Sequence, residues 1–351
     1  MNKLVLVGNG FDLAHGLNTR YNDFVLWYFN WVLTELVEKK ELSDQLIEIS
    51  FSQGRIQSFP SEVTSINGFK ELLKNHEGYV TFRIKCALFK ILYNKTIELN
   101  WVEIEYEYYS YLKSLFDRME SNSFRNSKKI EAQVKVLNSD FEYLKKRLQE
   151  YLNIVESSKK TKIPDIVAHF KNCFAKLNNN LESNLFLNFN YTSTIEMYLD
   201  EIKHDKYAIN YIHGKLNDER NPIIFGYGDE IDSYYQKIEN INYNAFLKNF
   251  KSFGYLLTSN YQKFSVFLER YPFEVYILGH SCGLSDRTML NKIVEHDNCR
   301  RIKIFYYKIS SNENDFIEKT YELSRHFSPN KKTRMRDIIE PFPESKPLVD
   351  C

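Results

Sequence analysis

The chain has 351 residues, which is enough for about two domains. Hydrophobic residues make up 43% of it and charged residues 26%, a balance that excludes disordered, collagen-like and coiled-coil proteins. Because 47 Lys and Arg nearly cancel 46 Asp and Glu, no net basic field draws the whole protein to nucleic acid or to an anionic membrane. We therefore expect a packed globular protein that has neither a membrane nor a nucleic acid as its partner.

The N-terminus and the cysteines indicate the compartment. Met1–Gly10 holds only a four-residue apolar run before a glycine, too short for the hydrophobic region of a signal peptide. No segment approaches the ~20 apolar residues of a membrane span. The five cysteines lie far apart and form no C-x-x-C pair, which favours reduced thiols over disulfides or a zinc site. We expect a cytoplasmic protein that binds no metal.

Short apolar runs, each followed by a turn and then a helical pattern, are the predicted strands. Near-continuous apolar runs of this kind are typical of strands that are buried on both faces of a parallel sheet. The pattern therefore predicts an α/β fold with a doubly wound, mostly parallel, Rossmann-like sheet. The runs are Leu4–Val7, Leu185–Phe189, Tyr207–Ile212, Val275–Leu278 and Ile302–Tyr307.

A long segment between the first two of these strands has a different pattern. No glycine lies between Gly78 and Gly214, and most of that stretch carries apolar residues at three- and four-residue spacing, as amphipathic helices do. We therefore expect a large all-helical insertion after the first strand. The predicted parts are an α/β core at residues 1–24 and 181–328, the helical insertion at residues 25–180, and a mobile tail, basic and then Pro-rich, at residues 329–351.

The loop Gly8-Asn9-Gly10-Phe11-Asp12 directly follows the first predicted strand. A glycine pair there lets backbone N–H groups approach a pyrophosphate, and the N-terminus of a following helix would add its partial positive charge. The third glycine of the dinucleotide fingerprint is missing at its usual spacing, so a tight turn explains the motif equally well. The spacing does not assign a ribose contact to Asp12.

Two further strands end in polar residues that suit a sugar or a water molecule. Asn190, in Phe189-Asn190-Tyr191-Thr192, can donate and accept hydrogen bonds, and the alternative is a left-handed turn or a cap of the helix that begins near Thr192. His213, next to Gly214, has an imidazole that is neutral near pH 7 and can accept a proton, and the alternative is a structural histidine.

The loop Gly279-His280-Ser281-Cys282-Gly283 follows the fourth predicted strand and leads to Ser285 and Asp286. As G-x-S-x-G between a strand and a helix, it matches the nucleophile elbow of α/β-hydrolases, with Ser281 as the nucleophile. As a Gly-Ser loop, it is a cradle for a phosphate or a ribose. Only one convincing strand follows Ser281 and no HGGG-type oxyanion loop is present, so the chain order favours the cradle.

One pattern inside the insertion stands apart from these loops. On a helix, Trp101, Glu105 and Tyr108 share a face, so aromatic surface beside Glu105 would raise the pKa of its carboxyl. An amphipathic helix with a solvated acidic edge is the alternative.

The motifs occur together in a specific order. The run from Gly8 to Phe24 reads G-N-G-F-D-L-A-H-G-L-x-T-x-Y-x-D-F, and the blocks F-N-Y-T, I-H-G and G-H-S-x-G-x-S-D follow it. These blocks, with Trp101 and Glu105, resemble the abortive-infection AbiH family of bacterial phage-defence proteins. The resemblance covers nearly the whole chain and implies a role in phage defence.

The same blocks resemble, more distantly, the NAD-binding site of sirtuin-like folds, where an asparagine and a histidine lie against the nicotinamide ribose. This resemblance implies that NAD is the ligand and that Asn190 and His213 are catalytic. The sirtuin four-cysteine zinc module is absent, which argues against a protein deacetylase but not against an NAD hydrolase. The residues implied to bind NAD are Gly8, Asn9, Gly10, Phe11, Asp12, Tyr191, Gly279, His280, Ser281 and Asp286.

These arguments lead to three hypotheses. The first is a phage-defence effector that binds NAD and hydrolyses its nicotinamide–ribose bond. The second is a non-catalytic nucleotide-binding sensor or scaffold of a defence system, and the third is a serine esterase that uses Ser281. The partners considered are NAD or a related nucleotide, a second copy of the chain, and a phage trigger that the sequence does not identify.

Overall fold

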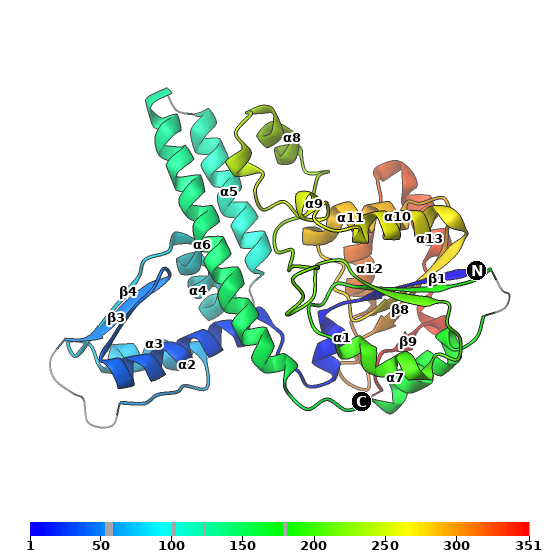
Figure 1. Cartoon of the computed structure of the whole chain (residues 1–351), viewed down its shortest axis with the longest axis horizontal. Coiled ribbons are helices and arrows are strands. Elements are labelled where there is room, and N and C mark those ends of the chain that lie inside the picture. The colour runs from blue at the N-terminus through cyan, green and yellow to red at the C-terminus, as the bar shows by residue number, and fades with distance from the viewer. Residues whose placement is uncertain (53–58, 100–102, 122–123, 178–180, 351) are drawn as a thin grey trace. The chain divides into compact units, whose positions relative to one another are not determined.

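The computed structural model of the chain describes residues 1–52, 59–99, 103–121, 124–177 and 181–350 (Figure 1). The chain divides into two compact units, which are treated separately below. The α/β unit comprises Met1–Leu17, Ile154–Gln236 and Asn249–Cys351, and the second unit comprises Asn18–Asn153 and Lys237–Lys248. The divisions after Leu17 and Asn153 differ from the expected boundaries after residues 24 and 180. Two helices, α6 (Phe124–Glu156) and α8 (Ser233–Asn240), have residues in both units.

The α/β unit is built on a six-stranded sheet in the order β6-β5-β1-β7-β8-β9, in which every neighbouring pair is parallel. This is the order of a doubly wound Rossmann-like sheet, in which the winding direction reverses between β1 and β7. The predicted fold class and its five strands are confirmed. The strands are β1 (Asn2–Val7), β5 (Asn184–Asn188), β6 (Tyr207–Tyr211), β7 (Phe273–Leu278), β8 (Cys299–Tyr306) and β9 (Lys346–Pro347).

Strand β1 shows why the apolar runs are continuous. Leu4 and Leu6 belong to one buried cluster, and Val5 and Val7 belong to another on the opposite face of the sheet. Each such side chain stabilises the fold by about 1.5–3 kcal/mol relative to exposure. The first cluster includes residues of α10 (Asn260–Arg270), α11 (Arg287–Val294), α12 (Phe316–Ser324) and α13 (Lys332–Ile338), and the second includes residues of α1 (Asn9–Ala14), α7 (Pro164–His169), the π-helix Phe170–Phe174 and the 3₁₀ helix Thr194–Glu201.

The C-terminal segment is not the mobile tail that the sequence predicted. Its strand β9 pairs in parallel with β8, and the backbone N–H of Leu348 donates to the carbonyl of Tyr306 at 2.8 Å. Ile338 and Leu348 are buried, so the segment covers apolar surface despite its charges and prolines. Pro347 is tolerated because it lies in an edge strand, where a missing N–H costs little.

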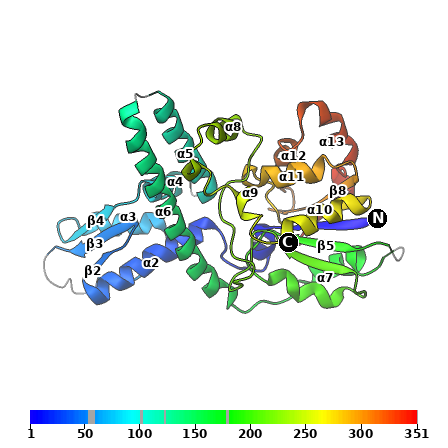
Figure 2. The ribbon, with the colours of Figure 1, turned by 45° about the horizontal axis from the view of Figure 1, so that its top comes forward.

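The second unit contains a three-stranded antiparallel sheet, so the prediction of an all-helical insertion is wrong (Figure 2). Asp44 forms the first turn, since its Oδ1 accepts hydrogen bonds from the N–H groups of Leu46 and Ile47 at 2.8 and 2.9 Å. Strands of three to five residues are too short to stand out against the helical periodicity around them. The elements are α2 (Tyr21–Lys39), β2 (Glu41–Ser43), β3 (Ile47–Phe51), α3 (Ile66–Asn75), β4 (Val80–Ile84), α4 (Ala87–Leu99), α5 (Ile104–Glu120), α6 (Phe124–Glu156) and the 3₁₀ helix Asn244–Phe246.

The remaining elements of the α/β unit are short. They are α9 (Lys251–Gly254) and the 3₁₀ helices Leu284–Asp286, Pro329–Lys331 and Phe342–Glu344. Within the described ranges, no helix is both long enough and apolar enough to cross a membrane.

Candidate functional site

The loops that follow β1, β5 and β7 meet at the carboxyl edge of the sheet. The N–H of Gly10 donates to the carbonyl of Gly279 at 2.7 Å, and the side-chain amide of Asn190 donates to the carbonyl of Gly8 at 3.0 Å. Ligands of doubly wound sheets bind at this edge, beside the strand where the winding reverses. The structure therefore brings three of the four predicted motifs into direct contact.

The glycines of these loops bring the two loops together. A Cβ added at Gly10 would lie 2.7 Å from the carbonyl oxygen of Gly279, and one added at Gly279 would lie 2.1 Å from the backbone nitrogen of Phe11. Gly279 also has φ +70°, a conformation that favours glycine. The N–H groups of Gly8 and Gly10 donate to the carbonyls of Leu278 and Gly279. The close approach of the two loops thus accounts for Gly8 and Gly10, neither of which has a positive φ, and their contact with a pyrophosphate stays a prediction.

The other residues of the first loop are placed differently from one another. Asn9 is exposed at the start of α1, whereas Phe11 and Asp12 are buried. The hydroxyl of Thr192 donates to Oδ2 of Asp12 at 2.5 Å, while Oδ1 of Asp12 has no hydrogen-bond partner. Burial raises the pKa of Asp12 to about 6. Asp12 and Thr192 therefore connect the first loop to the F-N-Y-T block.

Asn190 and Tyr191 also hold this edge together. Asn190 is 8% exposed, and its N–H donates to the side-chain oxygen of Asn188 at 3.1 Å. The hydroxyl of Tyr191 donates to the carbonyl of Ile224 at 3.2 Å. These bonds fix the loop after β5, and the catalytic role of Asn190 stays a prediction.

His213 lies at the centre of a buried polar cluster. Its Nε2 is 3.2 Å from Oδ1 of Asp286 and 3.2 Å from the hydroxyl of Tyr255, and only 4% of the residue is exposed. Burial lowers the pKa of His213 and the buried Lys251 ammonium adds to this effect, while Asp286 opposes it. Burial therefore favours the neutral imidazole, and the role of His213 as a proton acceptor stays a prediction.

Lys251 is a member of this cluster that the sequence reasoning missed. Its Nζ donates to Oδ1 of Asp286 at 2.7 Å, and 1% of the residue is exposed. Burial alone would raise the pKa of Asp286, but Lys251 and His213 hold it well below its usual value. A backbone pairing between Tyr227 and residues 249–251 places the lysine here. The sequence feature that could have indicated a buried lysine is the position of Lys251 between two aromatic residues, Phe250 and Phe253.

His280 completes the cluster. Its Nδ1 accepts a hydrogen bond from the N–H of Cys282 at 2.9 Å, so the other nitrogen carries the proton and faces Oδ2 of Asp286 at 3.6 Å. Burial lowers the pKa of His280 to about 3. The ring of Phe189 packs against His280 and His213 with centroid distances of 4.2 and 5.1 Å. The H-G and G-H-S-x-G-x-S-D blocks therefore form one site.

Ser281 does not belong to the cluster. Its side chain is exposed, and among the described residues no histidine makes a hydrogen bond to its hydroxyl. A nucleophile elbow needs a base beside the serine. The geometry gives no support to the serine-esterase hypothesis.

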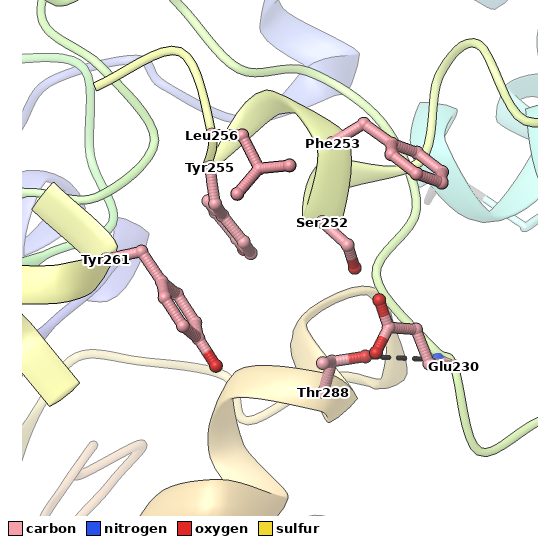
Figure 3. A pocket seen from close by; sticks show the side chains of 7 residues that line it. All are labelled: Glu230, Ser252, Phe253, Tyr255, Leu256, Tyr261 and Thr288. Atoms are coloured by element: carbon pink, nitrogen blue, oxygen red, sulfur yellow. Dashed lines mark hydrogen bonds between the residues drawn. The ribbon is translucent and has the colours of Figure 1, made fainter. Parts of the chain in front are cut away.

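A pocket of about 280 Å³ opens next to the cluster (Figure 3). Tyr255 belongs to both, because it lines the pocket and its hydroxyl contacts His213. The ring of Tyr255 stacks on His213 on one side, with planes 10° apart, and on Tyr261 on the other, with planes 16° apart. The pocket is lined by Glu230, Ser252, Phe253, Tyr255, Leu256, Tyr261 and Thr288.

Two other sequence features lie elsewhere. Trp101 lies outside the described residues. Glu105 is buried in the first turn of α5, in the second unit, so a solvated acidic edge does not describe it. In the part of the chain that the structure describes, no group of three or more His, Cys, Asp or Glu side chains is arranged to hold a metal ion.

Comparisons with known proteins gave one match. The sequence profile of a family described as "Bacteriophage abortive infection AbiH" matches residues 4–308, most of the chain. No curated protein and no solved structure matches it. The matched range includes every residue of the buried cluster and of the pocket.

Proposed function

This chain belongs to the AbiH family of bacteriophage abortive-infection proteins, and from this premise we propose that it binds NAD and hydrolyses the nicotinamide–ribose bond. Depletion of NAD would stop the growth of an infected cell and so limit the phage. The strand order supports the proposal, because a doubly wound sheet binds nucleotides at the edge where β1 and β7 end. The predicted pair Asn190 and His213 lies at that edge.

The observation that carries the proposal is the position of His213. Its Nε2 faces a carboxylate, Asp286, and a hydroxyl, Tyr255, and that hydroxyl belongs to a residue that lines a pocket. Nε2 can accept a proton in the tautomer that carries the proton on Nδ1, and the imidazole also hydrogen-bonds to the backbone of Phe189. Asp286 then faces the Nε2–H that forms. Lys251 keeps Asp286 ionised, so the carboxylate can stabilise the imidazolium that forms.

The proposed reaction is a hydrolysis. The bond between C1′ of the ribose and the pyridinium nitrogen breaks, and its electron pair stays on the nicotinamide, which leaves as a neutral molecule. A water oxygen bonds to C1′, and the proton of that water passes through the Tyr255 hydroxyl to Nε2 of His213. The proton then returns to solvent. General-base assistance of this kind accelerates a reaction by about 10²–10⁴-fold.

Nicotinamide release from NAD by the purified protein tests the proposal. We expect His213→Ala to lose about 10²–10⁴-fold in turnover while it keeps most of its NAD affinity, and Tyr255→Phe to lose turnover in the same direction. His296→Ala is the matched control, because His296 pairs with the exposed Glu269 and lies outside the cluster. Equal loss of binding in His213→Ala would make His213 a structural or anchoring residue.

A second measurement allows for a protein that becomes active only during phage infection. NAD would be followed in infected cells that express the wild-type protein or His213→Ala, and we expect it to fall only with the wild type. No NAD binding by the purified protein, with no loss of NAD in infected cells, would contradict the proposal.

A second candidate function is a nucleotide sensor without turnover. It is favoured by the burial of His213, of which only 4% is exposed. Calorimetry separates the two functions. Saturable NAD binding with no nicotinamide formed, with or without phage infection, would support the sensor.

A further inference from the structure

The pocket beside His213 has two unlike walls. Figure 3 shows the side chains of Glu230, Ser252 and Thr288 on one side and the rings of Tyr255 and Tyr261 on the other. A ligand that fills it therefore needs a flat apolar face and polar groups at its edge. These requirements exclude an aliphatic chain.

The hydroxyls of the polar wall have unused hydrogen-bonding capacity. Oγ of Ser252 is buried and has no hydrogen-bond partner. Oγ1 of Thr288 accepts from the N–H of Glu230 at 3.0 Å, which leaves its own O–H to donate. Because an unsatisfied buried hydroxyl costs free energy, Ser252 is suited to a ligand that carries a carbonyl or amide, and the O–H of Thr288 can donate to the same group.

The charge of the pocket narrows the class of ligand. Glu230 is the one ionisable carboxylate among the residues that line it, and no lysine, arginine or histidine is among them. A phosphate would be repelled by this carboxylate. The ring of Tyr255 is already stacked with His213 and Tyr261, and Nζ of Lys292 already lies 4.7 Å from the centre of the Tyr261 ring. The attraction of the pocket for a planar cation therefore comes from the Glu230 carboxylate. The apolar side chains of Phe253 and Leu256, 41% and 68% exposed, would cover the outer side of such a ring.

We propose that this pocket binds the pyridinium nucleoside end of the substrate, with Glu230 opposite the positive ring and Ser252 and Thr288 at its carboxamide. This inference rests on the proposed function, and it specifies which part of NAD the pocket binds. A volume of about 280 Å³ suits one ring and its sugar, and the phosphates and the second nucleoside lie outside. Tyr255 then lies between the bound nucleoside and His213.

The charge of the ring also explains product release. Hydrolysis converts the pyridinium into neutral nicotinamide, which has lost its attraction to Glu230. The oxidised cofactor is therefore bound in preference to the neutral product and to the neutral reduced cofactor. We expect the cation to bind about 10-fold more tightly than a neutral ring of the same shape.

Calorimetry with nicotinamide riboside tests the pocket without phosphates. We expect saturable binding to the wild type, about 10-fold weaker binding of dihydronicotinamide riboside, and a loss of about 10-fold in Glu230→Gln. Ser252→Ala should also weaken the binding of nicotinamide riboside. Glu269→Gln is the control, because Glu269 is an exposed carboxylate of α10 that pairs with His296. Thermal unfolding of each variant checks that it is folded.

Three results would overturn the inference: no binding of nicotinamide riboside at millimolar concentration, equal binding of the charged and neutral rings, and unchanged binding in Glu230→Gln. Binding of adenosine as tight as that of nicotinamide riboside would also overturn it, because the pocket would then recognise the ribose and not the positive charge of the ring.

The pocket and the hydrolysis can fail separately. If NAD is hydrolysed but Glu230→Gln keeps the wild-type KM for NAD, the assignment of the pyridinium nucleoside to this pocket is wrong and the proposed function stands. If nicotinamide riboside binds in a Glu230-dependent way but NAD is never cleaved, the pocket stands and the hydrolysis is wrong.

Discussion

Nζ of Lys251 lies 2.7 Å from Oδ1 of Asp286, and the two side chains are almost fully buried in the α/β unit. Removing each ion from water costs several kcal/mol, and only the partner charge and further hydrogen bonds offset that cost. His213 and His280 supply the further contacts with the carboxylate. The charge states of the four side chains are therefore coupled, so a substitution of one changes the electrostatic environment of the others.

Breaking this ion pair should destabilise the protein strongly. Lys251→Met leaves the Asp286 carboxylate buried without its cation, and we expect the free energy of unfolding to fall by about 3–5 kcal/mol. Lys215→Met is the control, because Lys215 forms a pair of similar length with Glu196 at the surface, worth at most about 1 kcal/mol. Urea unfolding measures both variants. Similar losses of unfolding free energy in the two variants would mean that Lys251 stabilises the buried Asp286 carboxylate only weakly.

His280 should make the protein less stable in acid. Burial lowers its pKa to about 3 from an unfolded value of 6.5, so below pH 6.5 the unfolded chain takes up a proton that the native state does not. Stability from this group is complete above pH 6.5 and falls by up to about 1.4 kcal/mol per pH unit as the pH drops towards 3. In His280→Asn the amide oxygen replaces Nδ1 as the acceptor, and unfolding between pH 5.0 and 7.5 should show a shallower slope than in the wild type. Parallel slopes would refute the prediction.

Asp12 should act in the opposite direction. Burial raises its pKa from 3.8 to about 6, so its contribution to stability is complete below pH 3.8 and is lost as the pH rises through 6, by ~3 kcal/mol at most. Asp12→Asn keeps an acceptor for the Thr192 hydroxyl and removes the titration. The difference in unfolding free energy between variant and wild type should shift in favour of the variant from pH 4.5 to pH 7. A constant difference over that range would show that Asp12 titrates normally.

Gly10 should be required for the stability of the fold, whether or not a ligand is bound. A methyl group there would meet the Gly279 backbone at 2.7 Å, and overpacking of this kind costs about 1–3 kcal/mol, so Gly10→Ala should unfold at lower urea concentration. Gly16→Asn is the control, since nothing lies within 4 Å of a Cβ at Gly16 and asparagine tolerates its positive φ. A wild-type midpoint for Gly10→Ala would mean that the two loops can separate, as a pyrophosphate between them would require.

The sequence by itself determined the α/β core and the family. The strand Leu4–Val7 and the four other predicted strands of the sheet are predictable, because a strand covered on both faces needs apolar residues at successive positions. Such a run is visible in the local sequence. The motif residues of these loops are likewise local signals, so their grouping at one edge follows once the strands are known to be parallel.

Only the tertiary structure decided which residues complete the site. Lys251 reaches Asp286 through a backbone pairing between residues that are more than twenty positions apart, and such a pairing leaves no periodic trace in the sequence. The same holds for Gly10 against Gly279, for the strand β9 beside β8, and for the short sheet of the second unit. In each case the contact depends on the path of the chain between two segments, whereas a sequence pattern reports only the surroundings of one segment.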